Sequence, residues 1–336
     1  MEAAPRYFAE TGGPVRCSLC PRSCSIPSGG LGACRVRGNK NGRALIPFYG
    51  FISALALDPI EKKPLYHFRP GTEILSIGFA GCNLRCPFCQ NWRISQNTGI
   101  EGRRMRPAEI VSAALRANSA AIAYTYSEPL VHAEFLLDCM ALARRHGIAN
   151  VLVSNGCVNV NAAREILALV SAANIDLKSF SAETYETILG GNLETVLDFI
   201  RLAVSMRVHV EITTLVVPGL NDSEEEPGRC ADFIASLSDT IPYHISAYHP
   251  DYRWNAPATR PALLLNCAEA ARVKLRYVYT GNIADGTFSD TACPHCGTAL
   301  VRRSGYRIDS SGLAAPEGEE PFYRCAACGG KTDIVS

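Results

Sequence analysis

The sequence predicts an α/β fold with a parallel sheet, in the form of a partial or complete (β/α) barrel. Between about residues 73 and 283, short apolar runs alternate with amphipathic stretches. The runs are rich in Val, Ile, Tyr and Thr and have the length of buried strands. Strand–helix alternation at intervals of a few tens of residues is typical of a parallel sheet. The predicted strands are Glu73–Ala80, Ala120–Tyr126, Asn150–Ser154, Asn174–Ser179, His209–Val217, His244–Tyr248 and Arg276–Thr280.

Two of the intervening stretches carry clear helix signals. Asn192 is a favourable N-cap in front of a run of apolar residues at helical spacing. A second apolar face follows Ala133 and stops at His146-Gly147, a pair that favours a helix C-terminus. These signals predict the helices that cover the sheet.

Polar residues cluster at or just beyond the ends of the predicted strands. In a barrel this rim is where active sites form, because the loops converge there while the strands hold them rigidly. We therefore expect an enzyme, independently of any motif. The rim residues are Cys82, Glu128, Asn155, Asp176, Lys178, Asn221, Asp222, His249 and Asp251.

Composition and cysteine content indicate which partners, compartment and domain organisation to expect. The 336 residues carry a net charge of +1, which gives no electrostatic reason to expect a nucleic acid or an anionic membrane surface as partner. Fifteen cysteines without a recognisable signal peptide favour metal and cluster ligation in a reducing cytoplasm over disulfides. The predicted organisation is an N-terminal Cys-rich segment at 1–66, a barrel at 67–290 and a small zinc-ribbon-like lobe at 291–336.

The most specific motif is a run of three cysteines directly after the first predicted strand. Cys82, Cys86 and Cys89 have the spacing C-x3-C-x2-C, with no fourth cysteine nearby. Zinc ribbons and ferredoxins use four protein ligands. A compact set of three favours a [4Fe-4S] cluster with one iron open to a small molecule, whereas the competing interpretations are a partial zinc site or three unrelated buried thiols.

With Phe88 before the last cysteine, this loop resembles the signature of radical S-adenosylmethionine (SAM) enzymes. The resemblance implies that SAM binds the open iron through its amine and carboxylate. It further implies that reductive cleavage of SAM yields a 5′-deoxyadenosyl radical, which abstracts hydrogen from a substrate that the sequence does not identify. An electron donor such as a ferredoxin or flavodoxin would be required.

The same resemblance suggests residues that contact SAM. Radical SAM enzymes commonly carry Gly-Gly-Glu at the end of the second strand, where this chain has Tyr126-Ser127-Glu128. Glu128 would accept from the SAM ammonium, or else cap the next helix. Activating enzymes of glycyl-radical proteins have similar Asn-Gly and Asp-x-Lys segments, although Val153 stands where they usually have an acidic residue. The implied SAM contacts are Phe88, Glu128, Asn155, Asp176, Lys178 and, most weakly, His249.

Each of the last three residues has a structural alternative. Asp176 and Lys178 lie two apart on one strand face and would pair with each other even at a plain surface. A lone histidine such as His249 is more often structural than catalytic.

Over residues 17–290 the chain most resembles the AmmeMemoRadiSam system radical SAM proteins, relatives of pyruvate formate-lyase activating enzyme. Memo-type and AMMECR-type proteins are the partners that this resemblance implies. A glycyl-radical activating enzyme and a multi-zinc scaffold protein are the alternatives. The motifs are Cys17–Cys24, Gly29–Cys34, the cluster loop with Gln90-Asn91-Trp92, Tyr124–Leu130, Asp176-Leu177-Lys178 and Tyr248–Tyr252.

Two further cysteine sets flank the predicted barrel. At the C-terminus two C-x2-C pairs are expected to form one tetrahedral site, with zinc preferred over rubredoxin-type iron, and to supply the folding energy of a small lobe. At the N-terminus the spacing C-x2-C-x3-C-x9-C is compatible with zinc or a second cluster. The C-terminal set is Cys293, Cys296, Cys325 and Cys328, and the N-terminal set is Cys17, Cys20, Cys24 and Cys34.

Overall fold

The computed structural model describes residues 4–336 except 11, 98, 224, 285 and 319. Its centre is an eight-stranded sheet in the order β7-β8-β10-β11-β12-β13-β14-β15. From β8 onward the neighbours run parallel, and β7 pairs antiparallel with β8. Within the described residues β7 and β15 each pair on one side only, so the barrel is partial and open. The α/β prediction is confirmed.

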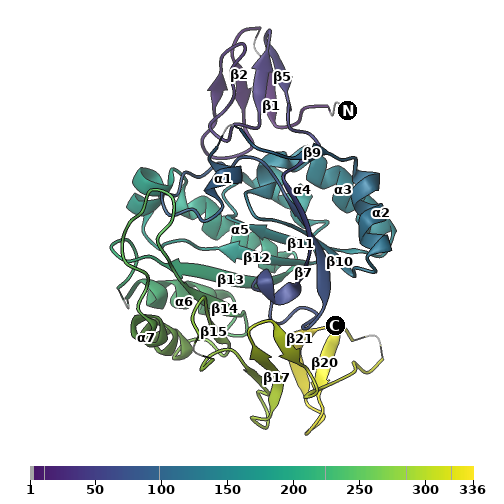
Figure 1. Ribbon diagram of the computed structural model, residues 1–336, viewed down its shortest axis with the longest axis vertical. Coiled ribbons are helices and arrows are strands. Elements are labelled where there is room, and N and C mark those ends of the chain that lie inside the picture. The colour runs from purple at the N-terminus through teal and green to yellow at the C-terminus, as the bar shows by residue number, and fades with distance from the viewer. Residues whose placement is uncertain (1–3, 11, 98, 224, 285, 319) are drawn as a thin grey trace.

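The sheet and its helices fill the middle of the molecule in Figure 1. The sheet strands are β7 Ala54–Pro59, β8 Glu73–Gly78, β10 Ala121–Thr125, β11 Ala149–Ser154, β12 Ala172–Asp176, β13 His209–Val216, β14 Tyr243–Ala247 and β15 Val278–Gly281. The helices are α1 Trp92–Ser95, α2 Pro107–Arg116, α3 Ala133–Arg145, α4 Val160–Leu167, α5 Leu193–Ser205, α6 Glu225–Leu237 and α7 Pro261–Arg272, with shorter turns at Ile60–Lys62, Pro129–His132 and Thr184–Leu189.

Local chemistry explains these elements. Every residue of β10 is buried, as expected for a parallel strand covered on both faces. The Asn192 side chain accepts a hydrogen bond from the Thr195 backbone N–H and so caps α5, as predicted. Helix α3 ends at His146, and Gly147 follows with a φ of 72° that favours glycine.

The N-terminal segment forms small antiparallel sheets at one end of the molecule (Figure 1). A buried ion pair fixes it to the barrel: the Arg37 guanidinium donates to both carboxylate oxygens of Glu134 on α3, at 2.7 and 2.9 Å. Such a bidentate pair has to stay intact, because an unpaired buried charge costs about 3–5 kcal/mol. The strands of this segment are β1 Phe8–Glu10, β2 Val15–Cys17, β3 Ser25–Ile26, β4 Gly38–Lys40, β5 Arg43–Leu45 and β6 Phe51–Ile52. Strand β6 pairs with β9 Arg103–Arg104, which follows α1 in the chain.

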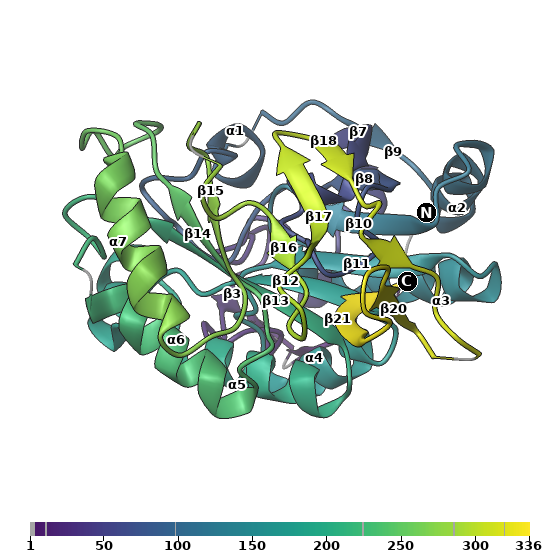
Figure 2. The ribbon, with the colours of Figure 1, turned by 90° about the horizontal axis from the view of Figure 1, so that it is seen from below.

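The C-terminal residues form two three-stranded antiparallel sheets at the other end. Figure 2, seen from below, shows the β17–β18 hairpin lying across the sheet toward β8 and β10. The backbone N–H of Val335 donates to His67, and that of Arg69 donates to Val335. The lobe is thereby attached to the segment that leads into β8. Its strands are β16 Thr291–Ala292, β17 Ala299–Ser304, β18 Arg307–Asp309, β19 Leu313–Ala314, β20 Phe322–Cys325 and β21 Lys331–Val335.

The seven predicted strands all occur, with ends that differ by at most three residues. The sequence analysis missed β7, which lies within the predicted N-terminal segment and pairs with β8 from Ala54 to Pro59. Its residues are mostly half-buried, in keeping with its place at the edge of the sheet. No helix in the described part of the chain is long and apolar enough to cross a membrane.

Candidate active site and metal centres

The three-cysteine loop begins three residues after the end of β8. Gly81 precedes Cys82 with a φ of 77°, and a Cβ there would lie 2.4 Å from the Cys34 carbonyl oxygen and 2.5 Å from Val36 Cγ2. Only glycine fits this close approach. The N-terminal cysteine segment therefore packs directly against the cluster loop.

The sulfur atoms of the loop are already within reach of hydrogen-bond donors. The Leu84 backbone N–H donates to Cys82 Sγ at 3.3 Å, and the Asn155 side-chain amide lies 3.6 Å from the same sulfur. The Ser95 hydroxyl is 3.2 Å from Cys89 Sγ. Donors of this kind stabilise a thiolate that ligates a metal, so the residues present fit a cluster at this loop.

Burial favours the protonated thiol at two of these cysteines, Cys82 and Cys86. It raises the pKa of Cys86 to about 12 and that of Cys82 well above its usual value. A metal centre that replaces the protons would remove this penalty, because a coordinated thiol is deprotonated.

The loop opens into a cavity of about 490 Å³ at the carboxyl ends of the strands. The structure thereby brings together the three cysteines and five of the six residues predicted to contact SAM. Those five are Phe88, Glu128, Asn155, Asp176 and Lys178. His249 is exposed and is not among the lining residues, so we do not carry it into the proposed SAM site.

Glu128 is buried, and both of its carboxylate oxygens accept hydrogen bonds. Its Oε1 accepts from the Leu130 backbone N–H at 2.9 Å and the Ser154 hydroxyl at 2.7 Å, and its Oε2 accepts from the Asn155 backbone N–H at 2.8 Å. The first bond caps the turn Pro129–His132, which is the structural role weighed for this residue. Burial raises the pKa of Glu128 to about 7, although these hydrogen bonds oppose the rise.

Asp176 and Lys178 form the expected pair, with Nζ and Oδ2 2.9 Å apart, at the edge of the cavity. Burial lowers the pKa of Lys178, but the adjacent Asp176 charge outweighs burial, and the net shift is upward. The ammonium is therefore charged at neutral pH, and the cavity wall carries a fixed positive and a fixed negative group side by side.

Sequence reasoning missed a polar cluster of four residues at the cavity. Asp58, at the end of β7, accepts from Lys62, Lys63 and the Tyr126 hydroxyl. Lys62, Lys63 and Tyr126 line the cavity. Asp58 and Lys62 are four residues apart, but Tyr126 reaches them only because β7 and β10 lie on either side of β8 in the sheet.

At Tyr126 the chain departs from Gly-Gly-Glu, yet the backbone there keeps a conformation that suits glycine. Its φ of 69° is a left-handed conformation that glycine adopts freely and tyrosine adopts at a cost of about 1–3 kcal/mol. The hydroxyl bond to Asp58 and the Lys63 ammonium, 4.3 Å from the ring centroid, hold the side chain in place.

The C-terminal lobe contributes one lining residue, Tyr306. The lobe is remote from the other lining residues in sequence, but in space its β17–β18 hairpin reaches the cavity. The Gly305-Tyr306 pair is a recognisable two-residue hairpin signal, but sequence does not show where such a hairpin points.

The four C-terminal thiols come together as predicted. Their sulfurs lie within 4.8 Å of one another, and the Cys293–Cys328 and Cys296–Cys325 pairs are 3.8 and 3.7 Å apart. Four thiolates bound tetrahedrally at about 2.3 Å would be separated by roughly 3.75 Å. The donor set therefore fits a single metal ion.

The N-terminal cysteines lie beside the cluster loop. Cys17 and Cys34 are buried, and Cys20 and Cys24 are half-buried. The Ala33 backbone N–H approaches Cys24 Sγ at 3.5 Å. Within the described residues this set does not form a group with sulfurs inside 4.8 Å, as the C-terminal set does.

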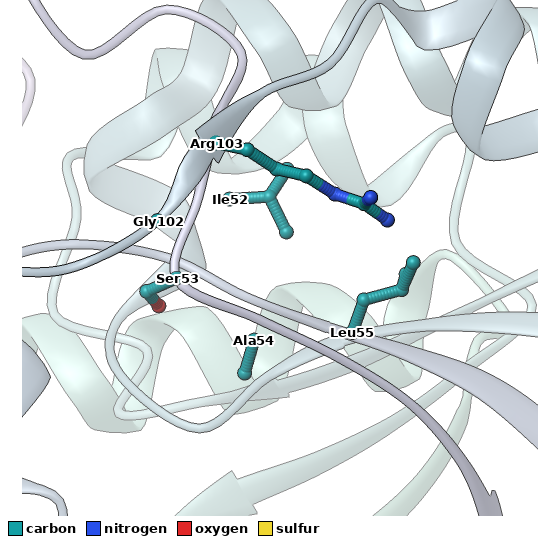
Figure 3. A pocket seen from close by; sticks show the side chains of 6 residues that line it. All are labelled: Ile52, Ser53, Ala54, Leu55, Gly102 and Arg103. Atoms are coloured by element: carbon teal, nitrogen blue, oxygen red, sulfur yellow. The ribbon is translucent and has the colours of Figure 1, made fainter.

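A separate hollow of about 320 Å³ lies beside β6 and β9 (Figure 3). Its lining residues, all described, include no cysteine, carboxylate or histidine, and Figure 3 shows the Arg103 side chain extending across it. This hollow offers no ligand for a metal.

Comparison with known proteins identifies the class. Residues 76–227 match the Radical SAM superfamily. The partial barrel resembles that of Streptococcus suis SuiB bound to S-adenosylmethionine, with a TM-score of 0.50 and 14% identity over 62% of this chain and 51% of SuiB. The chain belongs to the radical SAM superfamily and is an enzyme of that superfamily.

Two relatives define its position within the superfamily. The chain is 39% identical over 340 residues to the uncharacterized protein MJ0808 of Methanocaldococcus jannaschii, and the match covers all of both chains. It is 27% identical over 177 residues to the pyruvate formate-lyase-activating enzyme of Clostridium pasteurianum, which covers 51% of this chain and 73% of the relative.

Proposed function

We propose that Cys82, Cys86 and Cys89 hold a [4Fe-4S] cluster whose open iron binds SAM. When bound, cluster and SAM supply a 5′-deoxyadenosyl radical by one-electron reductive cleavage of SAM, and the radical abstracts hydrogen from a substrate. The observation that carries the proposal is the single cavity, which joins the three-cysteine loop to the carboxyl ends of neighbouring parallel strands.

The surrounding residues would bind and orient SAM. Glu128 offers a buried carboxylate for the SAM ammonium, and such a charge-assisted bond contributes about 1.5–3 kcal/mol. Asn155 donates toward Cys82 Sγ and fixes the loop. Asp176 and Lys178 would fix the polar groups of SAM at the cavity edge, and buried Phe88 excludes water from the loop.

Within the superfamily, the motifs named above favour an AmmeMemoRadiSam system enzyme, with Memo-type and AMMECR-type proteins as partners and a ferredoxin or flavodoxin as electron donor. The match to an activating enzyme supports a second candidate, a glycyl-radical activating enzyme that acts on a partner protein. A multi-zinc scaffold protein would have no use for the cavity and its polar rim.

We further propose zinc for Cys293, Cys296, Cys325 and Cys328, because their tetrahedral spacing fits one ion. For the N-terminal set the proposal stays open between zinc and a second cluster. A reducing cytoplasm suits both sets.

The decisive experiment compares SAM cleavage in wild-type protein and in a Cys82→Ala/Cys86→Ala/Cys89→Ala variant, both reconstituted anaerobically with iron and sulfide. With a strong reductant, wild type should form 5′-deoxyadenosine, and the variant should form none while retaining its C-terminal metal. A Cys230→Ala variant is the matched control, because that buried cysteine lies in α6 away from the loop. Undiminished cleavage in the triple variant would refute the proposal.

A further inference from the structure

The proposed SAM contacts leave part of the cavity lining unassigned. One wall within this part is formed by Lys62, Lys63, Tyr126 and Tyr306. These residues come from three parts of the chain: the turn after β7, the end of β10, and the C-terminal lobe. A radical enzyme has to place its substrate beside SAM, and this wall is the part of the unassigned lining that carries free cationic donors.

The charges on this wall do not cancel. Asp58 accepts from Lys62 at 2.9 Å and from Lys63 at 2.7 Å, so two ammonium groups share one carboxylate. Lys63 is buried, whereas the Lys62 side chain is 47% exposed. Asp58 takes one of the three N–H donors of Lys62. The ammonium can therefore still donate to a ligand in the cavity.

The Asp58 cluster is held in place by shared hydrogen bonds, as a binding surface requires. The Tyr126 hydroxyl donates to the same Asp58 oxygen that accepts from Lys63, and the Tyr126 backbone is held in its left-handed conformation. Strain of this kind persists only where the surroundings enforce it, and it concentrates at functional sites.

Tyr306 closes the wall from the side of the lobe. Ser304 pairs with Arg307, so Gly305 and Tyr306 are the two turn residues of a hairpin. Gly305 has a φ of 60°, as a turn with glycine at its first central position requires. The Tyr306 side chain is 61% exposed, which leaves its ring and hydroxyl accessible to a ligand at the cavity.

Arg303 anchors this hairpin to the barrel. Its guanidinium donates to the Thr291 hydroxyl at 2.8 Å and to the Tyr66 carbonyl at 2.9 Å. Thr291 lies two residues before Cys293, so the proposed metal site and the cavity wall are parts of one small structure. The hydrogen bonds of Arg303 therefore fix the position of the hairpin that carries Tyr306.

We propose that this wall is the substrate subsite and that it binds an anionic group, a carboxylate or a phosphate, through Lys62, with Tyr306 closing over the bound molecule. The inference rests on the proposed radical SAM function and deepens it. In this proposal the C-terminal lobe completes the substrate site, because it supplies Tyr306, and it also stabilises the chain.

Two probes test the subsite without knowledge of the substrate: inorganic phosphate, followed by ³¹P NMR, and ¹³C-acetate, followed by ¹³C NMR. Each is titrated into the full-length, metal-loaded protein. Wild type should bind at least one of them, and the preferred probe tells a phosphate subsite from a carboxylate subsite. Lys62→Gln should weaken that binding at least tenfold, and Lys62→Arg should largely restore it.

Tyr306→Ala should weaken binding several-fold, whereas Lys274→Gln is the matched control, because Lys274 is an exposed lysine paired with Asp232. Equal binding in wild type and Lys62→Gln, or no binding of either probe to wild type, would overturn the subsite. The proposed function fails separately: a wild-type protein that binds the anion but does not cleave SAM would refute the radical chemistry alone.

Discussion

Glu128 has a structural role at the cavity that is compatible with the SAM contact proposed above. It caps the turn after β10 and also joins β10 to the end of β11 through Ser154 and Asn155. These bonds would orient the carboxylate before SAM binds, which would reduce the cost of binding. The two roles weighed from sequence are therefore compatible in one residue.

Glu128→Gln should weaken SAM binding about tenfold or more, which corresponds to about 1.4 kcal/mol. In wild type the affinity should also fall as the pH drops below about 7, because the pKa of Glu128 is raised to about 7 and only the carboxylate attracts the SAM ammonium. Equilibrium dialysis from pH 6 to 8 measures both effects. Glu109→Gln, at an exposed position of α2, is the control. An unchanged affinity in Glu128→Gln would leave Glu128 with its capping role only.

Two buried histidines should make folding stability depend on pH. Burial lowers the pKa of His67 to about 3 and that of His132 to about 4. The unfolded chain takes up these protons below about pH 6.5 and the folded chain does not, so stability is full above that pH and is lost as the pH falls toward 4. At pH 5 each histidine should account for a loss of about 2 kcal/mol.

Urea unfolding at pH 7.5 and pH 5 measures this loss of folding stability. His132→Gln should show a smaller loss between the two pH values than wild type, because glutamine can still donate to the Ala80 carbonyl but does not titrate. The exposed helix-end His146→Gln should behave as wild type. Equal pH dependence in all three proteins would contradict the assignment.

At the scale of elements, periodicity and capping predicted the helix–strand order because those signals are local. Asn192 and Gly147 mark helix ends through bonds within a few residues of themselves. Strand β7 was missed because its place in the sheet depends on β8, and the Asp58–Tyr126 contact was missed with it. The Cys82 loop could be found from sequence because its ligands are only three or four residues apart.

The contact between the N-terminal segment and the cluster loop depends on Gly81. Gly81→Ala should destabilise the protein by about 1–3 kcal/mol more than Gly147→Ala and should lower the iron bound per chain. Both glycines have positive φ, but a Cβ at 147 would meet nothing within 4 Å. Equal losses in the two variants would show that backbone strain alone matters and that the packing against Cys34 does not.

On the scale of the whole molecule, two small cysteine-rich lobes flank one open barrel, and each contacts the proposed active site. The N-terminal lobe touches the three-cysteine loop at Gly81, and the C-terminal lobe reaches the cavity through Tyr306. The cysteine sets of both lobes are visible in the sequence, but these contacts are not, because docking depends on side chains far apart in the chain. The buried Arg37–Glu134 pair is one such contact, since nothing at position 37 alone predicts it.

A Cys296→Ser/Cys328→Ser variant should lose one metal ion per chain and unfold at a lower temperature. It removes two of four ligands from a lobe too small to fold on its own core. Iron bound at Cys82, Cys86 and Cys89 should remain. Metal analysis that finds less iron and unchanged zinc would reverse the assignment of the two centres.

The central claim is that SAM binds the open iron of a cluster on Cys82, Cys86 and Cys89. Electron–nuclear double resonance on the reduced, anaerobically reconstituted protein with SAM labelled with ¹⁵N at its amino group tests this directly. A nitrogen hyperfine coupling that is present in wild type and absent in the triple alanine variant is the predicted result. A reduced cluster that gives no coupling to the labelled nitrogen at saturating SAM would contradict the claim.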